Sequence, residues 1–195
     1  MQRYNDLSSY LKKKFGSRLL KLSIDGGFSC PNRKNGKKGC KFCSENGSGE
    51  FTTRRKSITE QLNAQINFLK DKDKYNGYIA YFQSYTNTFL SVEELRKMYY
   101  EAINFPNVKV LSIATRADCF NEEIYNLLEE LNEKIEVWIE LGLQSSNEKT
   151  RNSMNIGYST ETFENCVKRL KEINIKTIFH IIFGLPNETK IDYIN

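Results

Sequence analysis

The sequence predicts an α/β fold in which parallel strands alternate with helices. Five apolar runs rich in β-branched and aromatic residues recur along the chain, which is typical of strands buried in a parallel sheet. Each of the first four runs is followed by a helical pattern, which indicates βαβ units with right-handed crossovers. The 195 residues suffice for one domain with a sizeable core.

The predicted strands occupy residues 19–24, 78–82, 108–114, 135–143 and 175–183. Two capping boxes, SITE at 57–60 and SVEE at 91–94, indicate helix starts, because the Ser and Glu side chains satisfy each other's backbone N–H groups. Asn121 and Ser159 precede further apolar residues at helical spacing. We expect residues 1–18 to form a basic, partly helical lead-in and residues 19–195 to form the core.

Two architectures fit this order of elements: an open doubly wound sheet, and a complete or partial (β/α) barrel. Barrel enzymes place their chemistry at the carboxyl ends of the strands. The unusual polar segments follow the strands here, namely the cysteine loop, QSYTNT, TRAD, QSSN and GLPNET. The final residues, PNETKIDYIN, have the pattern of the first turns of another helix. We therefore expect the chain to be a truncated piece of a longer protein.

Composition and charge narrow the class of protein. No apolar run is long enough to cross a membrane, and the first residues lack the apolar core of a secretory signal, so we expect a cytoplasmic protein. Residues 1–56 carry 14 Lys and Arg against 4 Asp and Glu, whereas the remainder carries 15 against 20. This basic segment indicates either a surface that attracts nucleic acid or an ordinary solvated surface.

Three of the five cysteines, Cys30, Cys40 and Cys43, lie within fourteen residues. A structural zinc site usually has four ligands, and a disulfide framework needs an even number of cysteines. Three thiolates suit an iron–sulfur cluster in which one iron has no protein ligand. Cys119 and Cys166 lie far away in the sequence, and we expect them to behave as small hydrophobic residues.

The segments DGGFSCPNRKNGKKGCKFC, YFQSYTNT, SIATRADC, WIELGLQS and HIIFGLPNET together resemble the radical S-adenosylmethionine (SAM) superfamily. Within it, they are similar to a group related to the elongator catalytic subunit and, more distantly, to oxygen-independent coproporphyrinogen dehydrogenase. The similarity runs from about residue 18 to the end. It implies a partial (β/α) barrel and a [4Fe-4S] cluster held by the three loop cysteines, with SAM bound to the fourth iron.

The resemblance further implies an enzyme that cleaves SAM reductively to methionine and a 5′-deoxyadenosyl radical, using an electron donor such as flavodoxin or ferredoxin. The implied cofactor-binding residues are Phe42, Gln83, Ser84, Thr86, Arg116, Glu140, Gln144, Ile182 and Gly184. Phe42 and the segment 182–184 would contact the adenine, whereas residues 83–86 would contact the methionine amino group.

Two positions depart from the pattern of the superfamily. Ile156 stands where relatives often carry an arginine for the SAM carboxylate. Arg116 is our candidate to replace that charge, and Arg151 is the second candidate. His180 stands where the motif in the fifth strand has its first glycine, and a histidine there is expected either to pack in the barrel or to crowd the site.

The substrate and one alternative function stay open from the sequence alone. The basic segment and the elongator kinship favour RNA, with transfer RNA as the candidate substrate, whereas the coproporphyrinogen kinship favours a small molecule. The alternative is a nucleic-acid-binding module whose structural zinc is held by the three cysteines and Asp25 or another ligand. A simple electron carrier is disfavoured because such carriers normally use four cysteines.

Overall fold

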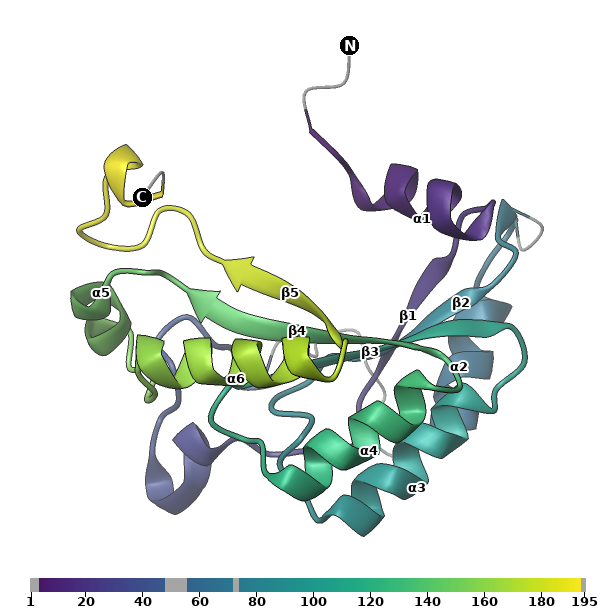
Figure 1. Cartoon of the computed structure of the whole chain (residues 1–195), viewed down its shortest axis with the longest axis horizontal. Helices are drawn as coiled ribbons and strands as arrows, with labels where there is room; N and C mark the ends of the chain where they lie inside the picture. The colour runs from purple at the N-terminus through teal and green to yellow at the C-terminus, as the bar shows by residue number, and fades with distance from the viewer. Residues whose placement is uncertain (1–3, 48–55, 72–73, 194–195) are drawn as a thin grey trace.

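The computed structural model describes residues 4–47, 56–71 and 74–193. Five parallel strands form one sheet in the order β1-β2-β3-β4-β5 (Figure 1), which confirms the predicted α/β class. The strands are β1 (Leu20–Ile24), β2 (Tyr78–Phe82), β3 (Val108–Thr115), β4 (Glu136–Gln144) and β5 (Lys176–Ile181). The last strand ends two residues before its predicted end, and the chain then turns away at residues 183–184.

The helices are α1 (Leu7–Phe15), α2 (Ile58–Asn67), α3 (Val92–Ile103), α4 (Glu122–Asn132), α5 (Glu148–Ser153) and α6 (Thr160–Glu172), with 3₁₀ turns η1 (Pro31–Gly36) and η3 (Lys190–Tyr193). Both predicted capping boxes form, at the starts of α2 and α3. Asn121 and Ser159 cap α4 and α6. Where the sequence predicted the start of a further helix, the described residues form only the short turn η3. Within the described residues, no helix has the length and apolar character needed to span a bilayer.

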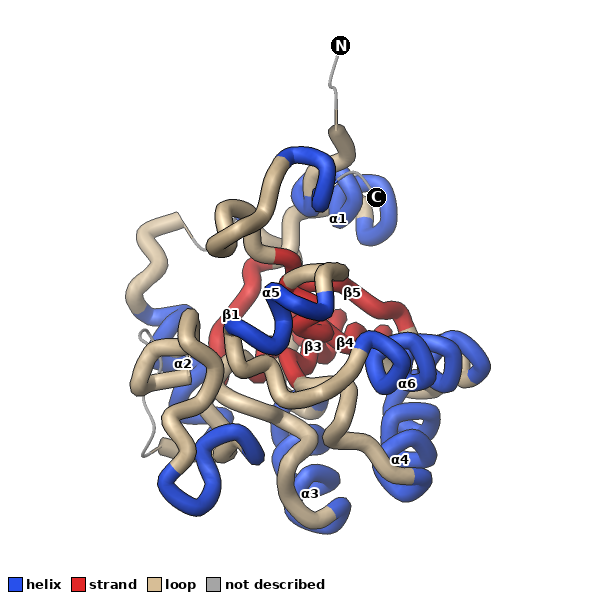
Figure 2. The backbone as a smooth tube through the Cα atoms, turned by 90° about the vertical axis from the view of Figure 1, so that its left-hand side faces the viewer, coloured by secondary structure: helices blue, strands red, loops and turns tan. Residues whose placement is uncertain are grey.

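The sheet is curved into part of a barrel. Its strands follow chain order without the reversal that marks a doubly wound sheet. Figure 2 shows them as an arc, with α2, α3, α4 and α6 around its convex side. Lys21 of β1 reaches Glu140 of β4, with 2.6 Å between Nζ and Oε1. A flat sheet would separate these two strands by about 14 Å, since neighbouring strands lie about 4.8 Å apart. The curvature therefore favours the partial barrel over the open sheet.

Apolar side chains cover the convex side of the sheet more extensively than the concave side. The main core lies between the convex side and the helices, and includes Leu22, Ile24, Phe82, Leu111 and Ile139 of the strands with Leu62, Leu95, Leu128 and Leu170 of the helices. On the concave side, a smaller cluster joins Leu11 of α1 to Ile79, Val110 and Trp138. The lead-in helix α1 thus packs against the concave side near the amino ends of the strands, and polar side chains occupy that side toward the carboxyl ends.

Candidate functional site

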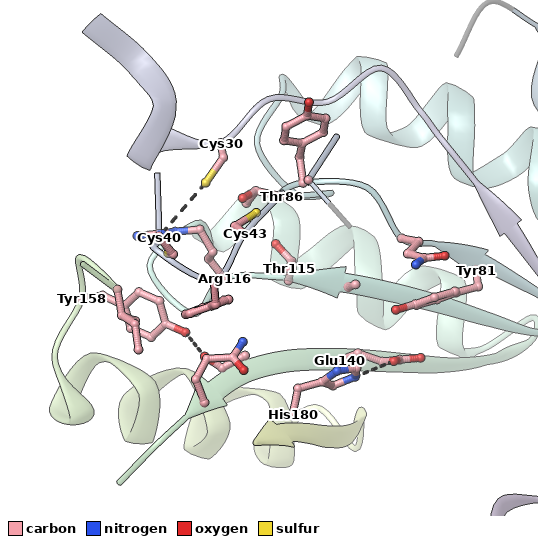
Figure 3. A pocket seen from close by; sticks show the side chains of 18 residues that line it. Cys30, Cys40, Cys43, Tyr81, Thr86, Thr115, Arg116, Glu140, Tyr158 and His180 are labelled. Carbon is pink, nitrogen blue, oxygen red and sulfur yellow. Dashed lines mark hydrogen bonds and ion pairs between the residues drawn. The ribbon is translucent and has the colours of Figure 1, made fainter. Parts of the chain in front are cut away.

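A cavity of about 290 Å³ lies on the concave side near the carboxyl ends of the strands (Figure 3). Its lining includes all three loop cysteines. It also includes six of the nine residues predicted to bind cofactor, namely Phe42, Gln83, Thr86, Arg116, Glu140 and Gln144. These residues come from β4, from the loops after β2 and β3, and from the cysteine loop after β1, so the fold gathers segments that are more than a hundred positions apart in the sequence.

The other three predicted residues lie outside the cavity lining. Ser84 is fully buried. Ile182 packs beside an apolar cluster that contains Met154, Ile156 and Leu185. Gly184 is exposed, and its backbone N–H donates a hydrogen bond to the hydroxyl of Tyr193. The segment after β5 therefore approaches the site without contributing to this cavity.

The cysteine loop is fastened on one side to the segment that follows α5. Asn32 Nδ2 donates to the carbonyl of Asn155 at 2.7 Å, and Asn155 Nδ2 donates back to the carbonyl of Gly39 at 2.7 Å. The backbone N–H of Lys41 also donates to the carbonyl of Met154. Gly157 has φ +77°, and a Cβ there would come within 2.4 Å of Asn32. These contacts tie the loop after β1 to the loop after β4 across the end of the barrel.

The opposite side of the cysteine loop is held by its own residue Arg33 and by the loop after β2. The guanidinium of Arg33 donates to the carbonyl oxygens of residues 43, 44 and 45. The hydroxyl of Tyr85 donates to the carbonyl of Glu45 at 2.6 Å. The backbone N–H of Thr86 donates to the carbonyl of Ser29 at 3.2 Å. The loop is thus held from both sides with its three thiols directed to one cavity.

Two polar side chains approach the thiols. Asn32 Nδ2 lies 3.3 Å from Cys40 Sγ, and Arg116 Nη1 lies 4.0 Å from Cys30 Sγ. Burial raises the pKa of Cys40, and the hydrogen bond from Asn32 acts in the opposite direction. N–H groups directed at sulfur tune the reduction potential of iron–sulfur clusters, because they stabilise the negative charge on the thiolates.

The two other cysteines do not line the cavity. Burial raises the pKa of Cys119 to about 12 and that of Cys166 to about 11.

The three thiols line the cavity where a metal group held by all of them would bind. Among the described residues, no three His, Cys, Asp or Glu side chains are gathered closely enough to hold one metal ion. Asp25, the fourth ligand considered for zinc, does not line the cavity, and its carboxylate accepts a hydrogen bond from the backbone N–H of Gly27 at 2.8 Å. Three thiolates that share a cavity suit an iron–sulfur cluster in which one iron has no protein ligand.

Arg116 and Arg151 have different surroundings, although the sequence left both as candidates for the SAM carboxylate. Arg116 lines the cavity and binds Asp118 through Nε and Nη2, at 2.9 and 2.8 Å, which leaves Nη1 directed toward Cys30. Arg151 is only 1% exposed and donates to the carbonyls of Leu143, Ser145 and Tyr158. Arg151 therefore supports the backbone, whereas Arg116 keeps a donor available at the site.

Two strained residues lie at the cavity. Of the seven non-glycine residues with positive φ in the described ranges, five are asparagines, and the other two are Tyr85 and Gln144. Both line the cavity. At Gln144 the pairing of β4 with β5 shifts register, and a Cβ on Gly142 would come within 2.4 Å of Gln144 Nε2. A bulge re-aims a side chain, and strain of this kind concentrates at functional sites.

Deeper on the concave side, a polar network surrounds Glu140, whose side chain is 2% exposed. Its Oε1 accepts from Lys21 at 2.6 Å and from Ser112, and its Oε2 lies 2.7 Å from His180 Nε2 (Figure 3). Burial by itself would raise the pKa of Glu140, but hydrogen bonds from these partners and the charge of Lys21 lower it to about 2. Tyr81 faces the same carboxylate, and its ring lies under Lys21 Nζ at 3.5 Å.

The cavity therefore has two walls of different character. We refer to Cys30, Cys40, Cys43, Arg116 and Gln144 as the rim, and to Tyr81, Glu140 and His180, with Lys21 beside them, as the floor. The sequence motifs pointed to the rim residues, to Glu140 and, as a packed or crowding residue, to His180, but not to Tyr81. The signal for Tyr81 was its alternation with Ala80 and Phe82, which face the main core, because neighbouring strand residues point to opposite faces.

Comparisons with known proteins agree on one family. The sequence model of the Radical SAM superfamily matches residues 29–195. The protein YtqA of Bacillus subtilis (strain 168) is 38% identical over 192 residues, which cover 97% of this chain and 60% of YtqA. The chain thus spans less than two thirds of that relative.

Two solved structures resemble the fold. Elp3 of the archaeon Methanocaldococcus infernus, with an N-terminal deletion, has a TM-score of 0.59 at 17% identity, over 90% of this chain and 40% of that chain. Coproporphyrinogen III oxidase (HemN) of Escherichia coli, described as a radical SAM enzyme, has a TM-score of 0.58 at 18% identity, over 97% of this chain and 43% of that chain.

Proposed function

The chain belongs to the Radical SAM superfamily, as its motifs predicted, and on this premise we propose that it is the catalytic core of an enzyme that cleaves SAM reductively. The superfamily implies an iron–sulfur cluster and SAM, and we propose a [4Fe-4S] cluster held by Cys30, Cys40 and Cys43. When bound, these groups supply one-electron cleavage of the sulfonium to methionine and a 5′-deoxyadenosyl radical that removes hydrogen from a substrate.

The observation that carries the proposal is the arrangement of the three thiols. They share one cavity and lie in a loop that is hydrogen-bonded to its neighbours on both sides. A loop fixed in this way holds three ligands in place and leaves one side of the cluster open to SAM. The zinc alternative needs a fourth ligand, and Asp25, the residue considered for it, does not line this cavity.

The rim provides groups suited to SAM. We propose that Arg116 Nη1 binds the carboxylate, since its other two nitrogens are engaged by Asp118 and Arg151 is engaged by backbone carbonyls. Phe42 lines the cavity with 39% of its surface exposed, and we propose that its ring packs on the adenine. Gln83, Thr86 and Gln144 complete the polar lining. Glu140, Ser84, Ile182 and Gly184 are assigned to the cofactor by resemblance only.

Anaerobic reconstitution with iron and sulfide tests this function. We expect a brown protein that binds about four iron atoms, as a [4Fe-4S] cluster requires, and that forms 5′-deoxyadenosine from SAM when dithionite reduces it. Uncoupled cleavage without the substrate is expected to be slow. A protein that takes up one zinc through these thiols, binds no iron anaerobically and leaves SAM intact would exclude the proposal.

For the substrate we propose RNA, with transfer RNA as the specific candidate. The support is electrostatic: Lys34, Lys37, Lys38 and Lys41 are exposed in the cysteine loop beside the cavity, and lysines attract phosphates. The basic residues of α1 lie at the other end of the sheet (Figure 1). The loop lysines are therefore the ones that would attract RNA to the cavity. A donor such as flavodoxin or ferredoxin supplies the electron that each cleavage consumes.

Nucleic acid that co-purifies under anaerobic conditions tests the choice of RNA. We expect bound RNA in the wild-type protein at low salt, and less of it when Lys37 and Lys38 are changed to Glu. Cluster content should be unchanged in that variant. Absence of RNA at low salt would contradict the choice of substrate without affecting the proposal of SAM cleavage.

A further inference from the structure

The rim and the floor are opposite parts of one cavity. Apart from Glu140, which only the resemblance assigns to the cofactor, the groups proposed to bind the cofactors belong to the rim and its loops. The floor lies further along the strands toward their amino ends, on β2, β4 and β5. A molecule bound against the floor would therefore face whatever the rim holds. The floor is also the part of the lining that carries a histidine, which is paired with a buried carboxylate.

The floor presents His180 to the cavity and hides the carboxylate behind it. The side chain of His180 is 47% exposed, whereas that of Glu140 is 2% exposed. Within the described residues, Glu140 is the hydrogen-bond partner of the imidazole. Figure 3 shows the ring directed from β5 toward Glu140 among the lining side chains.

The partners of Glu140 determine how the imidazole is oriented. Glu140 is ionised at neutral pH, because its pKa is about 2, so it accepts every hydrogen bond that it makes. Its charge is balanced by the ammonium of Lys21 at 2.6 Å. Nε2 of His180 must therefore carry the proton that it donates to Oε2. In the neutral ring, Nδ1 is then the nitrogen with a lone pair.

We propose that the floor is the substrate-binding part of the cavity, in which His180 Nδ1 accepts a hydrogen bond from an O–H or N–H group of the substrate. Glu140 is its positioning residue, and Lys21 holds Glu140 ionised. This inference rests on the proposed function for the identity of the bound molecule. A ribose hydroxyl or a base N–H of RNA has the required chemistry, whereas a substrate with only hydrogen-bond acceptors would not bind the neutral ring.

The orientation can be tested by NMR on ¹⁵N-labelled protein, because His180 is the single histidine of the chain. At about pH 8.5 we expect the tautomer with the proton on Nε2, because Glu140 Oε2 accepts from that nitrogen. Glu140→Gln should remove this preference. The matched control is Glu136→Gln, since Glu136 lies on the same strand and pairs with Lys14 and Lys176. A proton on Nδ1 in the wild-type protein would overturn the proposal, even if the variant does not fold.

Access to Nδ1 separates the substrate side from the SAM side. Diethyl pyrocarbonate acylates unprotonated imidazole nitrogen, and peptide mass spectrometry measures the reaction at His180. We expect modification of the wild-type protein, with the rate retained after the cluster and SAM are bound. A rate more than about tenfold slower in the SAM complex would assign His180 to the cofactor and overturn the inference. Failure to bind iron or SAM would instead defeat the proposed function, while the NMR result would still report the orientation of the ring.

Discussion

The rim and the floor of the cavity are built in different ways. The rim consists of loop residues held by backbone hydrogen bonds, by Gly157, and by left-handed conformations at Tyr85 and Gln144. The floor consists of strand residues held by a network of charges around Glu140. Loops at strand ends suit the binding of a large cofactor because the strands position several of them around one cavity. A strand holds one side chain in a fixed position. We therefore expect the rim to bind the cofactors and the floor to bind the substrate, so that substitutions in the two parts have different effects.

The largest effect is expected at the rim. Changing Cys30, Cys40 or Cys43 to Ala removes a thiolate that no neighbouring side chain replaces, so the cluster should be lost. Iron and sulfide analysis after anaerobic reconstitution measures this result. Cys119→Ala and Cys166→Ala are the matched controls, since both cysteines lie outside the cavity lining, and they should retain the full iron content. A cluster that survives the loss of Cys30 would break the assignment of the rim.

At the floor, Glu140→Gln is expected to act on stability. The substitution leaves Lys21 without its partner in a largely buried network, and the loss of one member of such a pair costs about 3–5 kcal/mol. Urea unfolding at neutral pH measures this change. Glu136→Gln should cost less, about 1 kcal/mol or below, because the side chain of Glu136 is 16% exposed whereas that of Glu140 is 2% exposed. Equal losses of unfolding free energy in the two variants would show that the floor network stabilises the fold no more than the ion pairs of Glu136 do.

The same network predicts how stability depends on pH. The pKa of Glu140 is lowered from 4.5 to about 2 in the folded protein. Its stabilising contribution is therefore present above about pH 4.5 and is lost as the pH falls toward 2. The size of this contribution is on the order of 3 kcal/mol. The acid-induced loss of stability should be smaller in the Glu140→Gln variant than in the wild-type protein, and an identical pH dependence would contradict this account.

Arg116→Ala should weaken SAM binding without loss of the cluster. One hydrogen bond between charged groups contributes about 1.5–3 kcal/mol, so Kd should rise roughly 10-fold to 150-fold. Equilibrium binding to the reconstituted protein measures the change. Arg96→Ala serves as the control, because Arg96 pairs with Glu130 on the surface. An unchanged Kd would show that the carboxylate is held by other groups.

The smallest effect is expected at Phe42. Phe42→Ala removes a partly exposed ring, and the loss of a single aromatic contact costs about 0.5–1.5 kcal/mol. The Kd for SAM should therefore rise a few-fold, with iron content unchanged. Phe68→Ala, at an 86% exposed ring, is the matched control. A loss of iron in the Phe42 variant would mean that the ring supports the cysteine loop rather than the adenine.

Much of the fold followed from local patterns in the sequence. The apolar runs and capping boxes located the strands and four helices to within a few residues, because buried strands and capped helices have strong local signals. The short elements η1 and α5 were not predicted, since six residues carry too little periodicity to identify a helix. The segment at 186–195 carried a helical pattern, yet its described residues form only η3.

The site was predictable to different degrees in its two parts. The cysteines, Arg116 and Gln144 were named from motifs at strand ends, and they line one cavity. Of the floor, the motifs pointed to Glu140 and to His180, whereas Tyr81 occupies an ordinary strand position and Lys21 meets Glu140 only when the sheet curls. The different roles of Arg116 and Arg151 also depend on tertiary contacts, namely Asp118 for the first and three backbone carbonyls for the second.

The central claim is that the three thiols leave one iron for SAM to occupy. The most direct measurement is the electron paramagnetic resonance spectrum of the anaerobically reconstituted and reduced protein, recorded with and without SAM. The account predicts the signal of a reduced [4Fe-4S] cluster that changes when SAM is added, and no such cluster signal in Cys30→Ala. A spectrum that SAM leaves unchanged at saturating concentration, or a protein that holds zinc in place of iron, would contradict it.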